Sequence, residues 1–365
     1  MRAIKVLLVD DSAVIRKVLG DLLSQDPLIE VVGTAPNGKI ALEKLPALNP
    51  DIITLDIEMP EMNGLDVVRE IRQQGNRIPI IMCSSLTAEG ASHTIDALAL
   101  GASDYVTKPS SHGVNTREVV GEDLVRKIKA LASQEQEGPT SLTATPTPQH
   151  HTVANLQEAA IVAIGVSTGG PNALVELLPR FPADFPVPIV LVQHMPPLFT
   201  KMLAERLSEV SKLPVSEAEH TQEIVPGQIY LAPGGFHMEI KRLLGRTVIA
   251  LHDGPPENSC RPAVDVLFRS VAKVYRERAL GVVLTGMGQD GLHGSKAIKQ
   301  TGGAIIVQDK ESSAVWGMPG AIVDAGLDPC VLPLSHIADE IARRVIKRGR
   351  APNRKVPGER ADSAV

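Results

Sequence analysis

Acidic side chains follow two short aliphatic runs near the start of the sequence. Asp10 and Asp11 follow residues 5–9, and Asp56 follows residues 52–55. If both runs are strands of one parallel sheet, their carboxyl ends meet at one edge and bring the three carboxylates together. Such carboxylates repel one another unless a cation neutralises them, and their hard oxygen ligands suit Mg²⁺. One carboxylate can then attack a phosphorus centre and form an acyl phosphate.

Two further polar residues end later aliphatic runs and could contact a phosphoryl group. Ser84 ends the run that starts at residue 80, and Lys108 follows a short run at 105–106. A hydroxyl can bond one phosphoryl oxygen, and an ammonium group can neutralise another. Each residue alone is a weak signal, since strand-end aspartates often form turns. The joint pattern across five runs predicts a phosphoryl-accepting site.

A different chemistry is predicted in the second half of the chain. Ser167 lies in the segment GVSTGG, residues 165–170, between an aliphatic run and a helical pattern. The glycines permit a sharp strand-to-helix turn that exposes the hydroxyl. Backbone N–H groups at the start of the helix can stabilise an oxyanion. Glycine-rich turns also bind phosphate or nothing, although the GxGxxG pattern is absent, so this motif alone leaves a nucleophile and a plain turn equally open.

A nucleophilic serine needs a base, and the base needs an orienting group. His194 ends another aliphatic run, and Asp290 lies in TGMGQDG just after a later one. A packed histidine and a turn aspartate are the plainer interpretations, but all three groups fall at carboxyl ends of strands. The order Ser–His–Asp differs from the Ser–Asp–His order of α/β-hydrolases. The Ser–Asp–His order would need His293 or His336 as the base and would leave His194 without a role. We therefore reject the α/β-hydrolase interpretation.

Two sheets are needed to position these residues. In the first part, five aliphatic runs alternate with helical patterns, which predicts an α/β fold of the (βα)5 flavodoxin-like type with a parallel sheet. The second part repeats the alternation and predicts a doubly wound α/β domain with a mainly parallel sheet. A hairpin-like insert is expected there, with turn signals at Pro226-Gly227 and Pro233-Gly234-Gly235.

The length and composition agree with two domains. A chain of 365 residues exceeds what one core usually organises. We predict a first domain at 1–132, a flexible linker at 133–158, a second domain at 159–349 and a disordered tail at 350–365. The linker stretch is rich in Pro and Thr and has no periodicity, so it cannot bury enough apolar surface to order itself.

The overall composition is that of a globular protein with reduced thiols. The net charge of −5 gives no attraction toward nucleic acid or anionic lipid. The three cysteines are far apart and show no CxxC spacing, which is typical of a reducing compartment. We find no signal-peptide pattern and no apolar run long enough to span a bilayer. These features predict a cytoplasmic protein without direct membrane insertion, and a monomer is the default expectation.

The stretch from Met1 to about Leu131 resembles a response-regulator receiver domain. The matching segments are VDDS at 9–12, LDIEMP at 55–60, NG at 63–64, CSS at 83–85 and YVTKP at 105–109. The resemblance implies a phosphorylated aspartate, a Mg²⁺ site, switch residues and a cis bond between Lys108 and Pro109. The implied roles are phosphoacceptor for Asp56, Mg²⁺ ligands for Asp10, Asp11 and Asp56, switch hydroxyl for Ser84, mobile aromatic for Tyr105 and phosphate contact for Lys108.

The stretch from Ala159 to Ile346 resembles the catalytic domain of the chemotaxis protein-glutamate methylesterases. The matching segments are GVSTGG, QHMP, SCRPAVDVLF at 259–268, TGMGQDG and GMP at 317–319. The family often has serine where Ala263 stands, which leaves the triad untouched. The resemblance implies a hydrolytic site without a cofactor, whose members are Ser167 as nucleophile, His194 as general base and acid, Asp290 as orienting group, and the backbone N–H groups of Met287 and Thr168 as oxyanion donors.

For the whole chain, the resemblance implies a hydrolase that removes methyl esters from glutamates of methyl-accepting chemotaxis receptors and releases methanol. A chemotaxis histidine kinase would phosphorylate the receiver. We expect the unphosphorylated receiver to cover the Ser167 cleft and phosphorylation to loosen this cover. Deamidation of receptor glutamine stays open, because an amide and an ester share the tetrahedral intermediate. A DNA-binding output is disfavoured, since the chain is acidic and lacks a helix-turn-helix with a basic recognition helix. An inactive scaffold is disfavoured by the intact triad.

Overall fold

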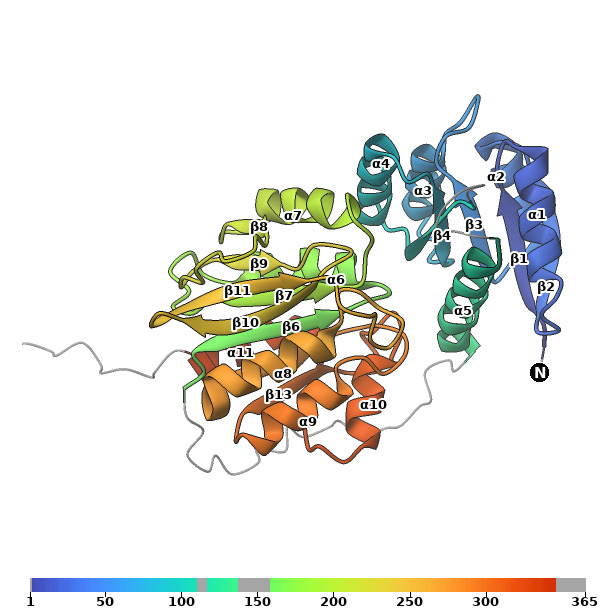
Figure 1. Ribbon diagram of the computed structural model, residues 1–365. Helices are drawn as coiled ribbons and strands as arrows, with labels where there is room; N and C mark the ends of the chain where they lie inside the picture. The colour runs from blue at the N-terminus through green and yellow to red at the C-terminus, as the bar shows by residue number, and fades with distance from the viewer. Residues whose placement is uncertain (1, 110–116, 137–157, 346–365) are drawn as a thin grey trace, which may run out of the picture.

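The computed structural model describes residues 2–109, 117–136 and 158–345. Most of the predicted linker and all of the predicted tail lie outside the described residues, so these boundaries stay predictions. Two parallel sheets, formed by separate parts of the chain, each carry helices on both faces (Figure 1). Among the described residues, no helix combines the length and the apolar character needed to cross a bilayer.

The first sheet has five parallel strands in the order β2-β1-β3-β4-β5, which confirms the predicted flavodoxin-like fold. Its central strands β3 and β4 are buried along their whole length, as strands covered on both faces must be. In chain order the elements are β1 (Ile4–Val9), α1 (Ala13–Leu23), β2 (Ile29–Ala35), α2 (Gly38–Leu48), β3 (Ile52–Asp56), α3 (Gly64–Gln73), β4 (Ile80–Ser84), α4 (Ala88–Ala99), β5 (Asp104–Thr107) and α5 (Arg117–Gln136).

The second sheet has seven strands in the order β14-β13-β12-β6-β7-β9-β8, and every neighbouring pair is parallel. It begins with β6 (Ile161–Val166), α6 (Gly170–Leu177), the 3-10 turn η1 (Leu178–Arg180), β7 (Ile189–Gln193), α7 (Phe199–Val210), β8 (Val215–Glu217) and β9 (Ile229–Leu231). It continues with α8 (Val264–Tyr275), η2 (Arg276–Arg278), β12 (Ala279–Val283), α9 (Leu292–Gln300), β13 (Ala304–Gln308), α10 (Met318–Asp324), β14 (Cys330–Leu332) and α11 (Leu334–Val345).

The expected hairpin insert is present as a separate antiparallel pair. It is formed by β10 (His237–Leu243) and β11 (Arg246–His252). Its turn lies at Leu244-Gly245 and not at the Pro-Gly pairs, which only connect preceding segments. Both turn residues have positive φ, 49° and 81°, the backbone conformation that two-residue hairpin turns require.

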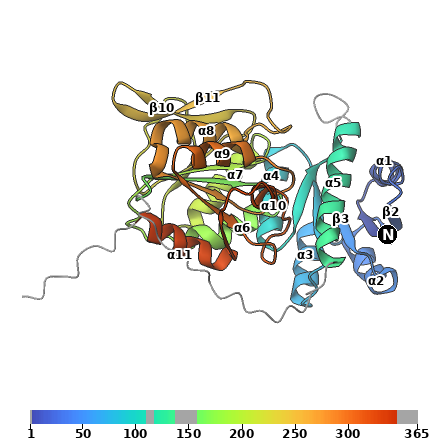
Figure 2. The same ribbon diagram turned by 90° about the horizontal axis from the view of Figure 1, so that it is seen from below.

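The two domains pack against each other through the receiver-fold helix α4, which contacts α6 and α7 (Figures 1 and 2). The ring of Tyr105, in β5, stacks on the ring of Phe199, at the start of α7, with centroids 4.8 Å apart. The amide of Asn172, in α6, donates a hydrogen bond of 2.9 Å to the carbonyl of Ala102. A cavity of about 360 Å³ lies between the domains and is lined by residues of both.

Candidate phosphoryl-accepting and active sites

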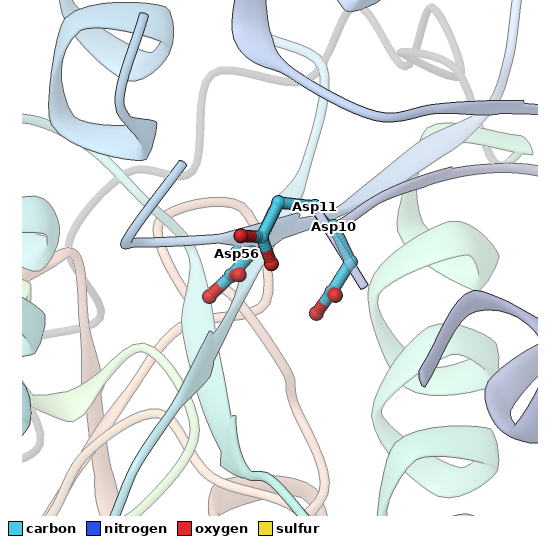
Figure 3. A group of neighbouring side chains, drawn as sticks. All are labelled: Asp10, Asp11 and Asp56. Atoms are coloured by element: carbon cyan, nitrogen blue, oxygen red, sulfur yellow. The ribbon is translucent and has the colours of Figure 1, made fainter. Parts of the chain in front are cut away.

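The three predicted aspartates meet at the carboxyl edge of the first sheet. Asp10 and Asp11 follow β1, Asp56 ends β3, and one oxygen of each lies within 4.8 Å of the others. Figure 3 shows the carboxylates of Asp11 and Asp56 close together, with that of Asp10 beside them. Asp10 and Asp56 are buried, whereas Asp11 is exposed. The strand order places β1 next to β3, so the register of the parallel sheet assembles this cluster.

Lys108 neutralises part of the charge of this cluster. Its Nζ lies 2.7 Å from Oδ2 of Asp56 and 3.0 Å from Oδ2 of Asp10. Burial nevertheless raises the pKa of Asp56 to about 6, although Lys108 acts in the opposite direction. One ammonium group therefore does not fully compensate the buried carboxylates.

The cluster has the chemistry of a divalent-cation site. Apart from contact with the Lys108 ammonium, Oδ2 of Asp10 and Oδ2 of Asp56 are buried without a hydrogen-bond donor among the described residues. One ammonium group shared by two buried carboxylates leaves negative charge uncompensated, which is costly and which a divalent cation would neutralise. The open side at Asp11 provides access. The residues present therefore fit Mg²⁺, which binds through carboxylate oxygens and retains water ligands.

The other predicted receiver residues surround the same space. The hydroxyl of Ser84, at the end of β4, donates to the carbonyls of Gly90 (3.0 Å) and Ser85 (3.2 Å). Ser84 and Lys108 line a small hollow together with Asp56. The bond between Lys108 and Pro109 is not cis, contrary to the expectation; the trans isomer is favoured by about 0.5–1 kcal/mol for such bonds.

Ser167 and His194 lie at the ends of neighbouring strands of the second sheet. Val166 pairs with Gln193 in the parallel register of β6 and β7, so the next residues of both strands stand side by side. The amide of Gln193 donates to the carbonyl of Ser167 over 3.0 Å. The turn into α6 passes through Gly169, whose φ is +74°. The predicted sharp strand-to-helix turn is therefore present.

Asp290 joins His194 from the loop after β12. Nε2 of His194 lies 2.8 Å from Oδ2 of Asp290. Burial alone lowers the pKa of His194, but the negative charges of the Cys260 sulfur, when it is a thiolate, and of the Asp290 carboxylate outweigh it and raise this pKa. Burial alone raises the pKa of Asp290, and the hydrogen bond with His194 outweighs it and lowers this pKa. The structure thus places an ionised carboxylate, that of Asp290, against the imidazole of His194. This is the arrangement that an orienting aspartate requires.

The structure also places the predicted oxyanion donors next to Ser167. Thr168 follows the serine directly, and a Cβ atom placed on Gly286 would lie 2.9 Å from Cβ of Ser167, so the loop that carries Met287 passes close by. Within the described residues, the backbone N–H groups of Thr168 and Met287 have no acceptor. Among the residues that the structure describes, no hydrogen bond joins the hydroxyl of Ser167 to His194.

Two residues near the pair were not predicted from the sequence. Nδ2 of Asn258 lies 2.9 Å from Oδ1 of Asp290, and Sγ of Cys260 lies 3.5 Å from Nδ1 of His194. Both belong to the segment before α8, far from either partner in sequence. The SCRPAVDVLF segment marked this region only through the family resemblance.

The fold and the sites define a class of protein: a response regulator whose receiver domain is joined to a second, parallel α/β domain. The profile described as "Response regulator receiver domain" matches residues 6–117, and "CheB methylesterase" matches residues 162–341. The chain belongs to the family of the protein-glutamate methylesterases/protein-glutamine glutaminases.

Similar proteins support this assignment along nearly the whole chain. A relative of that name from Trichodesmium erythraeum is 50% identical, with 94% of this chain and 100% of the relative covered. A second, from Nocardioides sp., is 49% identical, with 95% and 97% covered. The crystal structure of the Thermotoga maritima CheB methylesterase catalytic domain is 44% identical, covers 50% of this chain and 97% of its own, and gives a TM-score of 0.50.

Proposed function

We propose that this chain is a phosphorylation-activated hydrolase that removes methyl esters from glutamates of chemotaxis receptors. The observation that carries the proposal is the His194–Asp290 pair, joined at 2.8 Å beside the Ser167 turn, in a chain of this family. The proposal includes the division into a receiver at 1–132, a linker at 133–158, a catalytic domain at 159–349 and a tail at 350–365.

The hydrolytic step follows from the orientation of the histidine. Because Asp290 accepts a hydrogen bond from Nε2–H, the lone pair of His194 is on Nδ1, and Nδ1 takes the proton from the Ser167 hydroxyl. The serine oxygen attacks the ester carbonyl, and the N–H groups of Thr168 and Met287 bind the oxyanion. His194 returns the proton to the departing methanol, and water then hydrolyses the glutamyl-enzyme by the same route.

The receiver supplies the regulation. Asp10, Asp11 and Asp56 would hold Mg²⁺, which would neutralise charge during phosphoryl transfer from the histidine kinase. Asp56 accepts the phosphoryl group, Lys108 binds its oxygens, and the Ser84 hydroxyl turns from its carbonyl acceptors toward it. Val315 and Met287, next to the hydrolytic site, pack against the receiver core. We therefore propose that the unphosphorylated receiver limits access to Ser167.

The first experiment measures methanol release from methylated receptor membranes by wild type and by Ser167→Ala. We expect Ser167→Ala to abolish release, and Ser335→Ala, at a serine in α11, to leave it unchanged. Release by Ser167→Ala at the wild-type rate would exclude this nucleophile.

A second measurement separates ester from amide hydrolysis. The two relatives described above are named for both methylesterase and glutaminase activities, and the same intermediate serves both reactions. Receptors with glutamine in place of the methylated glutamate should release ammonia in a Ser167-dependent manner. Ammonia release without any methanol from methylated receptors would make the protein a deamidase.

A third experiment tests the receiver. A small-molecule phosphodonor with Mg²⁺ should raise methanol release by wild type and leave the rate of Asp56→Asn unchanged. The same stimulation in both proteins would show that Asp56 is not the phosphoacceptor.

A further inference from the structure

A tight turn at residues 257–260 lies beside the His194–Asp290 pair. The backbones of Glu257 and Cys260 exchange two hydrogen bonds, of 2.8 and 3.1 Å. The two residues between them, Asn258 and Ser259, both have positive φ, 50° and 61°. Asparagine adopts left-handed backbone readily in such turns, but for Ser259 this conformation costs roughly 1–2 kcal/mol and persists only where the surroundings enforce it.

Side chains on both sides hold this turn in place. The guanidinium of Arg269, in α8, donates two hydrogen bonds to the Glu257 carboxylate, at 2.6 and 2.8 Å. After the turn, the guanidinium of Arg261 donates to the carbonyls of Asp253 (2.7 Å) and Gly254 (3.0 Å). The turn is therefore fixed relative to α8 and to the segment that leaves β11.

Asn258 connects two buried carboxylates. Its Nδ2 donates to Oδ1 of Asp290 at 2.9 Å and to Oδ2 of Asp265 at 3.0 Å. An uncharged donor between two carboxylates reduces their repulsion and fixes the plane of each. The other oxygen of Asp290 is the one that lies against His194. Rotation of the Asp290 carboxylate would misplace the imidazole, so the amide of Asn258 acts on the histidine through Asp290.

Cys260 lies on the opposite side of the imidazole. Its Sγ is 3.5 Å from Nδ1, the nitrogen left free by the contact between Nε2 and Asp290. The proposed mechanism requires this same nitrogen to take the proton of Ser167. The thiol of Cys260 is half-buried, while Cys83 is buried in the receiver core and Cys330 starts β14.

We propose that the 257–260 turn positions the hydrolytic site: Asn258 fixes the Asp290 carboxylate, and Cys260 holds the Nδ1 of His194 that receives the serine proton. The inference rests on the proposed function and adds two positioning residues to it. It also gives a reason for the positive-φ backbone, because this turn directs the side chains of Asn258 and Cys260 to the two members of the pair.

The contribution of Asn258 is tested with two glycine variants. Asn258→Gly removes the amide and accepts the positive φ without strain, and Ser259→Gly makes the same backbone change next to it without removing a contact to the pair. In the presence of phosphodonor and Mg²⁺, we expect Asn258→Gly to lower kcat by about tenfold or more, with KM within roughly twofold. Ser259→Gly should keep the wild-type kcat. Equal kcat values in Asn258→Gly and wild type would overturn this part.

The contribution of Cys260 is tested by a pH profile. The groups that face the His194 ring are Asp290 and Cys260, with Asp265 behind them through Asn258. The base must be neutral to act, so kcat/KM rises with pH as His194 loses its proton. Because an S–H group that donates to the unprotonated Nδ1 favours the neutral ring, we expect Cys260→Ala to move this limb to higher pH by about half a unit or more.

The matched control is Cys330→Ala, which should leave the limb where it is in wild type. Coincident limbs for Cys260→Ala and wild type would refute the contact with Nδ1. Thermal unfolding of each variant shows whether it is folded. Absence of methanol release from wild type would instead count against the proposed function, so the two failures are distinguishable.

Discussion

At the residue scale, Asp290 is the most heavily hydrogen-bonded member of the hydrolytic site. Besides His194, it accepts the backbone N–H groups of Val264 (2.6 Å) and Asp265 (3.0 Å), the first residues of α8. The positive end of the helix dipole stabilises a carboxylate at this place. These donors explain why Asp290 is ionised although it is buried. An ionised Asp290 in turn fixes the tautomer of His194, and the choice of Nδ1 as base follows from it.

This arrangement predicts that Asp290→Asn loses most of its activity. The amide has nearly the same volume, but its NH₂ group cannot accept a hydrogen bond from Nε2–H and favours the wrong tautomer. We expect kcat for methanol release to fall by roughly 10³–10⁴-fold, as for orienting aspartates of other triads. Asp339→Asn, at an exposed position of α11 away from the pair, is the control and should keep the wild-type kcat. An Asp290→Asn enzyme with near wild-type kcat would contradict the orienting role.

At the element scale, the turn between β6 and α6 places the nucleophile. Gly169 has φ of +74°, and a Cβ there would lie 2.4 Å from Cβ of Ala314. A Cβ on Gly170 would meet the side chain of Gln193 at 2.0 Å. Both glycines are therefore required by close packing beneath Ser167. The turn is a rigid support for the serine and its neighbouring N–H groups.

We predict that Gly169→Ala destabilises the protein more than Gly288→Ala does. Gly288 also has positive φ, +82°, but a Cβ there meets nothing within 4 Å. Gly288→Ala should cost about 1–2 kcal/mol for the backbone alone. Gly169→Ala adds the clash with Ala314, for roughly 1–3 kcal/mol more. Chemical denaturation of both variants measures the difference, and equal free energies of unfolding would mean that the turn can relax.

Most elements and most of the candidate site could be predicted from the sequence, because buried parallel strands of five or six residues are continuous aliphatic runs and their carboxyl ends collect functional side chains. Strands β8, β9 and β14 were not predicted, since three residues are too few to show a pattern. The roles of Asn258 and Cys260 were also missed. They depend on a positive-φ turn and on partners 32 and 66 residues away, which no local pattern encodes.

At the scale of the whole molecule, the receiver contacts the catalytic domain next to the nucleophile. Asn172 lies in the first turn of the helix that follows Ser167 and bonds to Ala102, and Phe199 lies five residues after His194 and stacks on Tyr105. Tyr105, which the resemblance to receiver domains suggests as the mobile aromatic residue, is thus held in an aromatic stack that a change of its rotamer would break. Both elements that carry the proposed nucleophile and base are therefore in direct contact with the receiver.

If these contacts hold the inhibited arrangement, Asn172→Ala should raise the activity of the unphosphorylated enzyme. Loss of one hydrogen bond between the domains is worth about 1 kcal/mol, which changes the ratio of closed to open forms by about fivefold. Methanol release without phosphodonor should rise by a similar factor, and the stimulation by phosphodonor should shrink accordingly.

Glu205→Ala, at an exposed position of α7, is the control and should behave as wild type. The activity of Asn172→Ala with phosphodonor should equal that of wild type, because the phosphorylated receiver has already released the contact. Unchanged basal release by Asn172→Ala would show that the contact between Asn172 and Ala102 does not contribute to inhibition.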